Sequence, residues 1–519
     1  MQFSWLDLIV FFCYCGIILG LGLWISTKKG TGDSEGYFLA GKSLPWWAIG
    51  TSLIAANISA EQMIGMSGSG YAIGLGIASY EWLAALTLIL VAKYMMPIFI
   101  EKGIYTMPQF LEMRFDERVR VSLAVFWILV YIFVNLTSVL YLGALSMETI
   151  LGIDLITGVI GLAVFSAVYT IYGGLNAVAW TDVVQVIFLV GGGLVTTFFA
   201  LNAYSDGGGA IAGFAGLVRD FPGKFHMILD QSNEYYDDLP GLSVIFGGLW
   251  VASISYWGCN QYIIQRALAA KDVREAQRGI MFAGYLKILM PLIVVIPGIA
   301  AYGLGAELEQ ADEAYPWLLG NYVTTGFRGL TFAALIAAIA SSLSSMANST
   351  STIFTLDIYQ AHVKKDSSEK ELVFVGRIVS FIAIVLAVSV APLLNNFEQA
   401  FQFIQEFTGF ISPGVVAIFL LGLYWKKATA NSALWAAILT IPLSFLFKWF
   451  APGIPFLDRM GIIFLILCGV IVAISIYEGF EDDAKAINWH TEMFHTGHVF
   501  NIGSIGICGI LAVLYLIFW

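Results

Sequence analysis

Long apolar runs alternate with short polar segments along almost the whole chain. About 20 consecutive apolar residues cross a bilayer as a helix, and only helices or closed barrels can span a membrane. Because these runs are long and continuous, they indicate helices. The pattern predicts fourteen membrane spans, at residues 5–26, 45–75, 78–104, 119–150, 155–173, 176–204, 241–266, 277–304, 327–358, 371–395, 398–425, 429–450, 459–478 and 499–519. The expected fold class is therefore an all-α polytopic membrane protein.

The composition agrees with this pattern and excludes several classes of function. Of the 519 residues, 59% are apolar and only 12% are charged, and the net charge is −11. A soluble domain carries roughly 25% charged residues, so this chain could not cover a surface that faces water. A soluble enzyme and a disordered regulator are excluded, and the acidic balance argues against a nucleic-acid partner.

Basic residues gather in every second loop between the predicted spans. Lys102, Arg118, Arg266 and Lys365 belong to these loops, whereas the alternate loops, such as residues 205–240, are acidic. Loops that stay in the cytoplasm carry an excess of Lys and Arg. The bias therefore predicts that the basic loops face the cytoplasm and that both termini lie outside.

Among the ionisable residues inside predicted spans, five are singled out: Glu61, Glu81, Asp182, Lys287 and Glu406. An unpaired charge in the membrane costs several kcal/mol, so each of these residues is a functional candidate. In this interpretation no Arg lies in the middle of a span, and no His lies in any span. The missing histidines argue against a histidine-ligated metal, a histidine proton relay and an intramembrane enzyme.

The second and eleventh spans carry polar and small residues at the depth of the membrane centre. Residues 51–62 read TSLIAANISAEQ, and Pro413 interrupts the eleventh span. Such a composition suits a helix that breaks, frees backbone carbonyls and points half-helix ends at a cavity. A proline also removes a hydrogen bond from the helix. A packing kink, which is common in membrane helices, is the alternative interpretation.

The ninth span is rich in hydroxyl groups, with serines at positions 341, 342, 344 and 345. Neutral hydroxyl oxygens suit Na⁺, a hard cation that prefers oxygen ligands. Small residues also allow helices to approach closely. This segment alone does not decide between ion binding and packing.

Taken together, these segments resemble the sodium/solute symporter family, and most closely its bacterial sodium/galactose (sodium/glucose) cotransporters. The matching segments extend nearly from end to end. They are YFLAGKSLPWW at 37–47, AANISAEQ at 55–62, GMSGSGY at 65–71, YEW at 80–82, NLTSVLY at 135–141, AWTDV at 179–183, Tyr256-Trp257, QYIIQR at 261–266, Ser341-Ser342 and Gln405. A chance match to so many separated segments is negligible.

The resemblance implies a LeuT-type fold with two inverted repeats of five helices each. An extra span would occupy residues 1–40, the first repeat 41–204, an outer loop 205–240, the second repeat 241–425, and three peripheral spans 426–519. This division pairs the second span with the seventh as the two broken helices.

The resemblance also assigns roles to individual residues. A sodium site would use the backbone carbonyls of Ala55, Ile58 and Ala338 and the hydroxyls of Ser341 and Ser342, and Asp182 would assist sodium release to the inside. The sugar would contact Gln62, Glu81, Lys287, Gln405, Asn57 and Ser253. Tyr256 would stack on the sugar as the inner gate, with Asn57 hydrogen-bonded to it across the break. Met66, Tyr80 and Phe401 would form the outer gate.

The chemistry of the implied sugar site fits a neutral hexose. Carboxylate and amide oxygens accept from sugar hydroxyls, ammonium and amide groups donate to them, and an aromatic ring covers an apolar face. Glu81 and Lys287 balance in charge, which favours a neutral substrate. Two positions depart from the galactose-transporter pattern: Ala84 stands where a serine is expected, and Ser253 where an asparagine is expected. The identity of the sugar is therefore open among galactose, glucose, fucose and relatives.

The sequence thus predicts symport of Na⁺ and a neutral hexose into a bacterial cell across the inner membrane. An alternative within the family is a sodium symporter for inositol, an amino acid or sialic acid. A cation channel is a second alternative, but channels use symmetric filters or charged rings, which this chain does not display. The lipid bilayer and the sugar are the expected partners, and a homodimer is left open.

Overall fold

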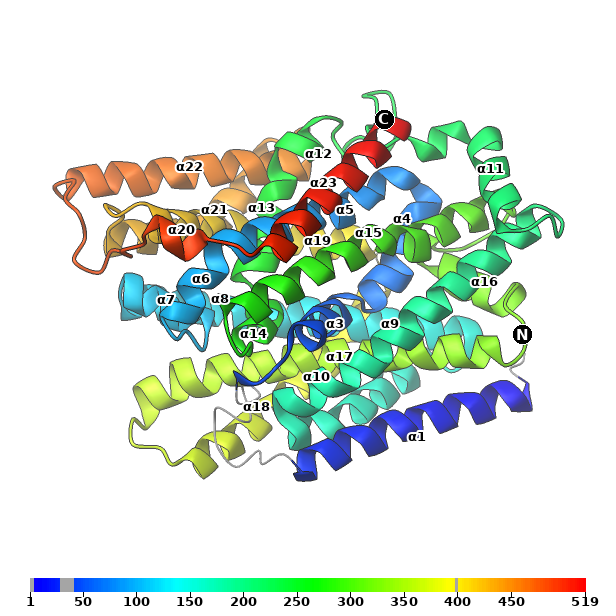
Figure 1. Ribbon diagram of the computed structural model, residues 1–519, viewed down its shortest axis with the longest axis horizontal. Coiled ribbons are helices and arrows are strands. Elements are labelled where there is room, and N and C mark those ends of the chain that lie inside the picture. The colour runs from blue at the N-terminus through cyan, green and yellow to red at the C-terminus, as the bar shows by residue number, and fades with distance from the viewer. Residues whose placement is uncertain (1–3, 29–41, 397–399) are drawn as a thin grey trace.

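The computed structural model describes residues 4–28, 42–396 and 400–519, and within these ranges the chain is helical. The one β-bridge among them joins Leu44 to Ala270. Most helices run along the long axis of the molecule (Figure 1). The all-α prediction is confirmed, whereas residues 29–41, which include part of the matching segment 37–47, lie outside the described ranges.

The first half of the chain ends with a long helix, α10, that contains two apolar segments, Leu155–Val168 and Val178–Tyr204. The label η is used here for a short 3₁₀ or π segment. The elements of this half are α1 (Trp5–Lys28), α3 (Trp46–Asn57), η2 (Glu61–Met66), α4 (Ser67–Ala72), η3 (Leu75–Ala78), α5 (Ser79–Leu90), η4 (Val91–Met95), α6 (Met96–Glu101), α7 (Met107–Arg114), α8 (Glu117–Val130), η5 (Tyr131–Leu136), α9 (Thr137–Leu151) and α10 (Leu155–Tyr204).

The second half repeats the mixture of long and interrupted helices. Its elements are α11 (Ala210–Asp220), η6 (Pro222–Phe225), α12 (Ser243–Phe246), α13 (Gly248–Ile254), η7 (Ser255–Cys259), α14 (Gln261–Leu268), α15 (Val273–Gly303), η8 (Ala311–Glu313), α16 (Ala314–Asn321), α17 (Phe327–Thr352), η9 (Ile353–Val363), α18 (Glu369–Val390), η10 (Ala391–Asn396), α19 (Ala400–Gly409), α20 (Ser412–Tyr424), α21 (Ala430–Phe450), α22 (Phe456–Tyr477), η11 (Thr491–Phe494) and α23 (His498–Ile517).

Ten helices in the described ranges are long and apolar enough to cross a membrane, and a bent pair raises the number to as many as eleven. The other predicted spans are 45–75 and 241–266, which contain breaks, and 155–173, whose apolar helix is short. These three segments are not single long apolar helices, but a broken or short helix can still cross a membrane. The count of fourteen stays a prediction.

The second predicted span breaks where its polar residues lie. Helix α3 ends at Asn57, because Ile58 takes an extended backbone conformation. The chain becomes helical again at Glu61, whose N–H donates to the Ser59 hydroxyl at 3.1 Å. The Ser59 N–H donates in turn to Oε1 of Gln62 at 3.3 Å. These two hydrogen bonds satisfy backbone N–H groups that the break exposes.

The seventh predicted span breaks in a similar way at Asn260, which is also extended. Tyr131, from a different part of the chain, covers this break. Its hydroxyl donates to Oδ1 of Asn260 at 2.5 Å and accepts from the N–H of Gln261 at 2.9 Å. The pairing of a broken second span with a broken seventh span, expected from the family resemblance, is therefore seen in the fold.

The eleventh predicted span is bent rather than continuous. Helices α19 and α20 meet at an angle of 50°, and Pro413 lies in the first turn of α20. A proline is tolerated there because the first N–H groups of a helix have no intrahelical partner. The prediction that Pro413 interrupts the hydrogen-bond ladder is confirmed.

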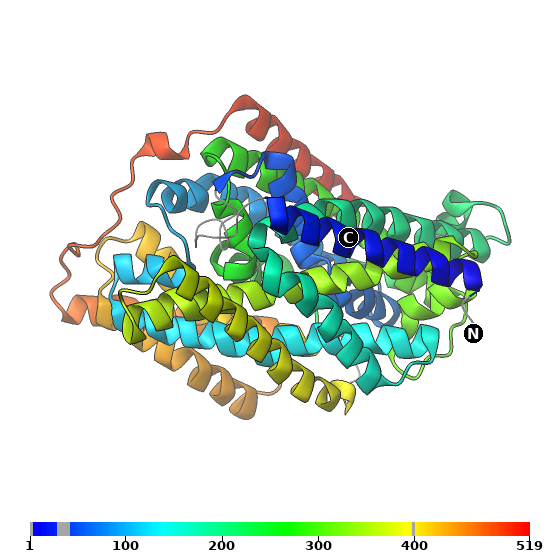
Figure 2. The same cartoon turned by 90° about the horizontal axis from the view of Figure 1, so that it is seen from below.

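Helix α17 forms the centre of the bundle and α23 its edge. The apolar part of the span 327–363 is 94% buried inside the protein, against 17% for that of α23. Helix α17 packs on α10, and α1 lies against both of them on the outside of the bundle (Figure 1 and Figure 2). The serine-rich segment of the ninth predicted span therefore lies in the core.

In Figure 1 the N-terminus lies at the right end of the molecule and the C-terminus on its upper side, in the same half. Asp7 of α1 accepts hydrogen bonds from the N–H groups of Gly326 and Gly329 at the start of α17. At the other terminus, the carbonyl of Phe518 accepts from the N–H of Met227 at 2.8 Å. The two ends therefore share a face with the loops 205–240 and 305–326.

Candidate functional site

A cavity lies between the two broken helices and the bent one. All residues predicted to contact or gate a sugar line it. Its wall consists of Asn57, Glu61, Gln62, Met66, Tyr80, Glu81, Ala84, Leu249, Ala252, Ser253, Tyr256, Trp257, Lys287, Phe401, Gln405, Thr408, Gly409 and Ser412.

Lys287 and Glu81 form a buried ion pair at one wall of the cavity. Nζ of Lys287, from α15, lies 2.5 Å from Oε2 of Glu81, from α5, and both side chains are almost fully buried. The ammonium also donates to Oδ1 of Asn57 and lies 5.1 Å from the ring centroid of Trp257. A buried charge needs such partners, because its desolvation is costly. The pair therefore presents charged groups to a ligand without adding net charge.

Tyr256 closes the cavity beside the break in the second predicted span. Its hydroxyl accepts from Nδ2 of Asn57 at 2.9 Å and from the hydroxyl of Tyr262 at 2.7 Å. The contact between Asn57 and Tyr256 joins α3 to η7, and so connects the two broken helices. This is the hydrogen bond that the sequence predicted for the inner gate.

The three residues predicted for the outer gate meet at another part of the wall. The rings of Tyr80 and Phe401 pack edge to face, with centroids 5.3 Å apart. Phe401 lies against Gly65, where a Cβ atom would come within 3.1 Å of the Cβ of Phe401. Met66 and Phe401 are each 1% exposed. The contact joins α5 to α19.

The residues predicted for sodium lie at the C-terminal end of α3. The hydroxyl of Ser342, from α17, is 3.5 Å from the carbonyl of Ala55 and 3.3 Å from that of Ala56. Because α3 ends at Asn57, carbonyls in its last turn lack helical partners, and this end of the helix carries partial negative charge. Carbonyl and hydroxyl oxygens together make a donor set that suits a small hard cation.

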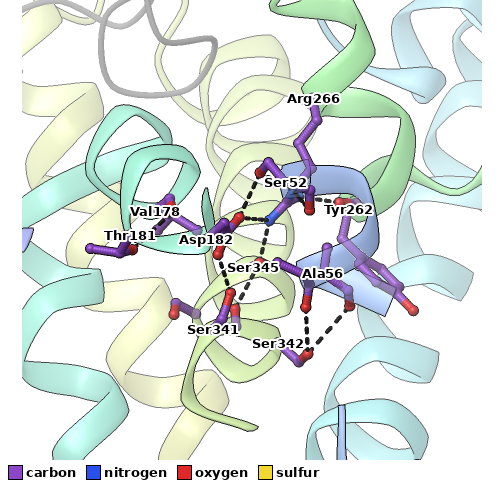
Figure 3. A network of polar contacts seen from close by, with 12 residues as sticks. Ser52, Ala56, Val178, Thr181, Asp182, Tyr262, Arg266, Ser341, Ser342 and Ser345 are labelled. Carbon is purple, nitrogen blue, oxygen red and sulfur yellow. Dashed lines mark hydrogen bonds and ion pairs between the residues drawn. The ribbon is translucent and has the colours of Figure 1, made fainter. Parts of the chain in front are cut away.

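Asp182 extends this site with a carboxylate (Figure 3). Its Oδ1 accepts from the hydroxyl of Ser341, and its Oδ2 accepts from the hydroxyl of Ser52 at 2.5 Å. Asp182 is fully buried on α10. It thus connects α10 to α3 and to the serines of α17, directly beside the end of α3.

Arg266 corrects one expectation drawn from the sequence. The charge bias places Arg266 in a cytoplasmic loop, but this residue lies in α14 and is fully buried. Its Nη2 is 3.7 Å from Oδ2 of Asp182 and donates to Ser345, and its Nε donates to the Ser52 hydroxyl at 2.9 Å (Figure 3). Arg266 is the last residue of the segment QYIIQR, at the end of an apolar run. Hydropathy predicts a loop at such a position, because a charged residue follows apolar ones.

Glu406 does not belong to the cavity, although it lies next to Gln405. From α19, its carboxylate pairs with Arg459 of α22 at 3.0 Å and with Lys448 of α21 at 3.1 Å. The ionisable group that the sequence marked as a functional candidate therefore attaches α19 to two peripheral helices.

Two further cavity residues were not assigned to the predicted sugar site, although Glu61 was one of the ionisable candidates. Trp257 supports Lys287, and Glu61 faces the cavity from η2. A sequence signal existed for Glu61, because it is an ionisable residue in the polar segment 51–62 of the second predicted span.

Comparison with known proteins identifies the family. The model of the sodium:solute symporter family matches residues 37–440. The chain belongs to the sodium:solute symporter family. It is 54% identical to the sodium/glucose cotransporter of Vibrio parahaemolyticus over 99% of this chain and 98% of that protein. It is 34% identical to sodium/glucose cotransporter 4 of Mus musculus, over 93% and 78%, and to sodium/myo-inositol cotransporter 2 of Oryctolagus cuniculus, over 85% and 69%.

A solved structure supports the fold. The substrate-bound outward-open state of a Na⁺-coupled sialic acid symporter matches with a TM-score of 0.81 at 23% identity, over 92% of this chain and 98% of that chain. At this identity the likeness concerns the fold alone. As a member of the family, the chain is a membrane transporter that couples solute movement to Na⁺, and it is not an enzyme.

Proposed function

We propose that this protein carries a neutral hexose, glucose or galactose, into the cell together with Na⁺. The observation that carries the proposal is the Lys287–Glu81 pair, with its N–O distance of 2.5 Å, in a cavity that Tyr256 also lines. The pair offers donors and acceptors without net charge, and the Tyr256 ring offers a face for the apolar side of a pyranose. The names of the sodium/glucose relatives support this choice.

Gln62, Gln405, Asn57 and Ser253 are proposed to complete the sugar contacts. The Ser253 hydroxyl is buried and has no hydrogen-bond partner in the described part of the chain, so it is available to a ligand. Sodium is proposed to bind between the carbonyls of Ala55, Ile58 and Ala338 and the hydroxyls of Ser341 and Ser342, with Asp182 receiving the ion as it leaves. Na⁺ is a transported substrate here.

We propose alternating access between two repeats, residues 41–204 and 241–425, around this site. The contact of Tyr80 with Phe401 and that of Asn57 with Tyr256 each join elements of different repeats. Opening the first contact would expose the sugar site to the outside, and opening the second would expose it to the cytoplasm. Sodium at the end of α3 would favour the arrangement of α3 and α17 that binds sugar.

The energetics of one co-transported ion suffice for concentration of a neutral sugar. Moving one charge inward through ~100 mV yields about 2.3 kcal/mol, and a tenfold sodium gradient adds about 1.4 kcal/mol. Together these terms support an accumulation of about several hundredfold.

Uptake of labelled hexose into proteoliposomes tests the proposal. Sodium-driven uptake is expected, with little uptake when potassium or choline replaces sodium. Ser342→Ala removes one proposed ion ligand and should weaken the sodium dependence while the protein still inserts. Thr350→Val is the matched control, because the Thr350 hydroxyl donates only to Met346 of the same helix. Equal uptake in all three salts would contradict sodium coupling.

Competition with other solutes tests the alternative within the family. If inositol, an amino acid or sialic acid is carried and neither hexose competes, the charge-balance argument fails. The proposed location is the inner membrane of a bacterium with both termini in the periplasm. The homodimer stays a prediction, and light scattering of the detergent-solubilised protein tests it.

A further inference from the structure

Glu61 is the cavity residue whose chemistry the proposed sugar site leaves unused. It begins η2, a π-helical segment, directly after the break in the second predicted span. Its side chain is 3% exposed, and it lines the cavity together with Glu81 and Lys287. Asn135 is a side-chain partner of the carboxyl group, while Oε1 has no hydrogen-bond partner among the described residues. Short π-helical segments occur often at functional sites.

No cation accompanies this carboxyl group in the described part of the chain. The titratable groups that face it are Tyr80 and Glu81 of α5, Tyr256 of η7, Tyr262 of α14 and Lys287 of α15. Of these only Lys287 carries positive charge, and its ammonium is bound to Glu81 at 2.5 Å and to Asn57.

Titratable side chains on the other elements packed against η2 are engaged elsewhere. Glu406 of α19 pairs with Arg459 and Lys448, Tyr141 of α9 contacts Gln310, and Tyr315 of α16 donates to Thr196. Asp312 of η8 lies at the outer end of this region, beside Gly68. None of these groups supplies a counter-charge to Glu61.

The balance of charge decides which form of Glu61 suits a neutral sugar. With Glu61 ionised, the cavity would hold two carboxylates and one ammonium, and the excess negative charge would be buried without compensation. A buried uncompensated charge is far more costly than a buried neutral polar group. A protonated carboxyl group avoids this cost and supplies an O–H donor.

We propose that Glu61 is a further sugar-contacting residue that stays a neutral carboxylic acid and donates a hydrogen bond from its free oxygen to an oxygen of the bound hexose. The inference rests on the proposed hexose function and adds a donor that Glu81, as an ionised acceptor, cannot provide. Glu61 and Lys287 then donate to the sugar, and Glu81 accepts from its hydroxyls.

The test compares Glu61→Gln and Glu61→Ala with the wild type in proteoliposomes, using labelled glucose and galactose at pH 6.5 to 9. Gln keeps the shape and a donor, so its KM should stay near that of the wild type at pH 6.5. Ala removes the donor, so KM should rise about tenfold with little change in maximal rate. Met63→Leu is the control, because Met63 is buried in the same segment and does not line the cavity.

The pH profile separates a donor from a merely structural group. The wild-type KM should rise at alkaline pH as Glu61 loses its proton, whereas Glu61→Gln should lack this rise. Glu81, Lys287 and the tyrosines are the same in both proteins, so the difference reports on Glu61 even if Glu61→Ala does not fold.

Three results would overturn the inference: an unchanged KM in Glu61→Ala, a loss in Glu61→Gln as large as in Glu61→Ala, or the same pH profile in the wild type and in Glu61→Gln. Absence of sodium-driven hexose uptake in the wild type would instead contradict the proposed function itself, so the two failures are distinguishable.

Discussion

Ala84 and Glu81 lie three residues apart on α5 and therefore share one face of that helix. Both line the cavity, and Ala84 is 3% exposed. Where the galactose-transporter pattern has a serine hydroxyl, this chain presents a methyl group to the cavity. The hydroxyl of Ser253, on another wall, has no protein partner in the described ranges and offers a different polar contact.

Restoring the serine should change the choice between hexoses. Ala84→Ser adds one hydrogen-bonding group in a dry pocket, so we expect the galactose-to-glucose uptake ratio to shift by up to about tenfold, equivalent to ~1.4 kcal/mol. Competitive uptake in proteoliposomes measures the ratio. Ala85→Ser is the matched control, because Ala85 is buried but does not line the cavity. A ratio that stays flat would mean that Ala84 carries no specificity.

Asp238, in the loop 205–240, makes stability depend on pH. Burial, together with the negative charges of Asp237 and Glu406, raises the pKa of Asp238 to about 6. The folded protein therefore holds this proton more tightly than the unfolded chain, and stability falls as pH rises from about 4 to 6. Asp238→Asn should stabilise the protein at pH 8 by about 1 kcal/mol, with a smaller gain at pH 5.

Thermal unfolding in detergent at both pH values measures this effect. Asp230→Asn is a control of opposite sign, because hydrogen bonds from Ser232 lower the pKa of the exposed Asp230. Its stabilising contribution is present at neutral pH, so its removal should lower the melting temperature at pH 8. The increase in melting temperature caused by Asp238→Asn should be larger at pH 8 than at pH 5. An equal increase at both pH values would exclude the titration of Asp238 as the cause.

At the scale of elements, one buried arginine connects four helices. Arg266 of α14 contacts Ser52 of α3, Asp182 of α10 and Ser345 of α17. It also donates to the carbonyl of Tyr262, whose hydroxyl donates to Tyr256, the proposed gate. Tyr262 therefore links the proposed ion site to the proposed inner gate, through its backbone on one side and its side chain on the other.

Removing one partner of the Arg266–Asp182 ion pair should destabilise the protein more than removing both charges. Arg266→Gln leaves the carboxylate of Asp182 buried without a cation, and such a loss typically costs about 3–5 kcal/mol. The double variant Arg266→Gln with Asp182→Asn should recover part of that stability, because neither charge then remains. Melting temperatures of the two single variants and the double variant measure the coupling. Strict additivity would show that the two residues do not interact.

At the scale of the whole molecule, Asp7 and Met227 place both termini against loops that the charge bias assigns to the outside. We therefore expect a cysteine at residue 2, or one appended after Trp519, to react with an impermeant reagent from the periplasmic side. Lys365→Cys, in the exposed turn before α18, should react only after permeabilisation. The native Cys13 and Cys508 are exposed and must first be replaced. Labelling of Lys365→Cys in intact cells would reverse the topology.

The sequence by itself determined the membrane character, most spans and the places where helices break. Three signals determine these features from nearby residues alone: hydropathy, the small polar residues around Asn57, and Pro413. They suffice because each peptide group in a membrane must find its hydrogen bond close by along the chain. The set of residues that line the cavity also followed from the sequence, through the family resemblance carried by short segments such as residues 55–62.

Only the tertiary structure decided which polar groups are paired and which are not. Arg266 lies at the end of an apolar run and reads as a loop residue, yet helices far apart in the sequence bury it beside Asp182. Glu406 and Glu61 look equivalent in the sequence, but two cations from α21 and α22 reach Glu406 and none reaches Glu61 in the described chain. The physical reason is that the cost of a buried charge depends on its neighbours in space, and helix packing, rather than local composition, sets those neighbours.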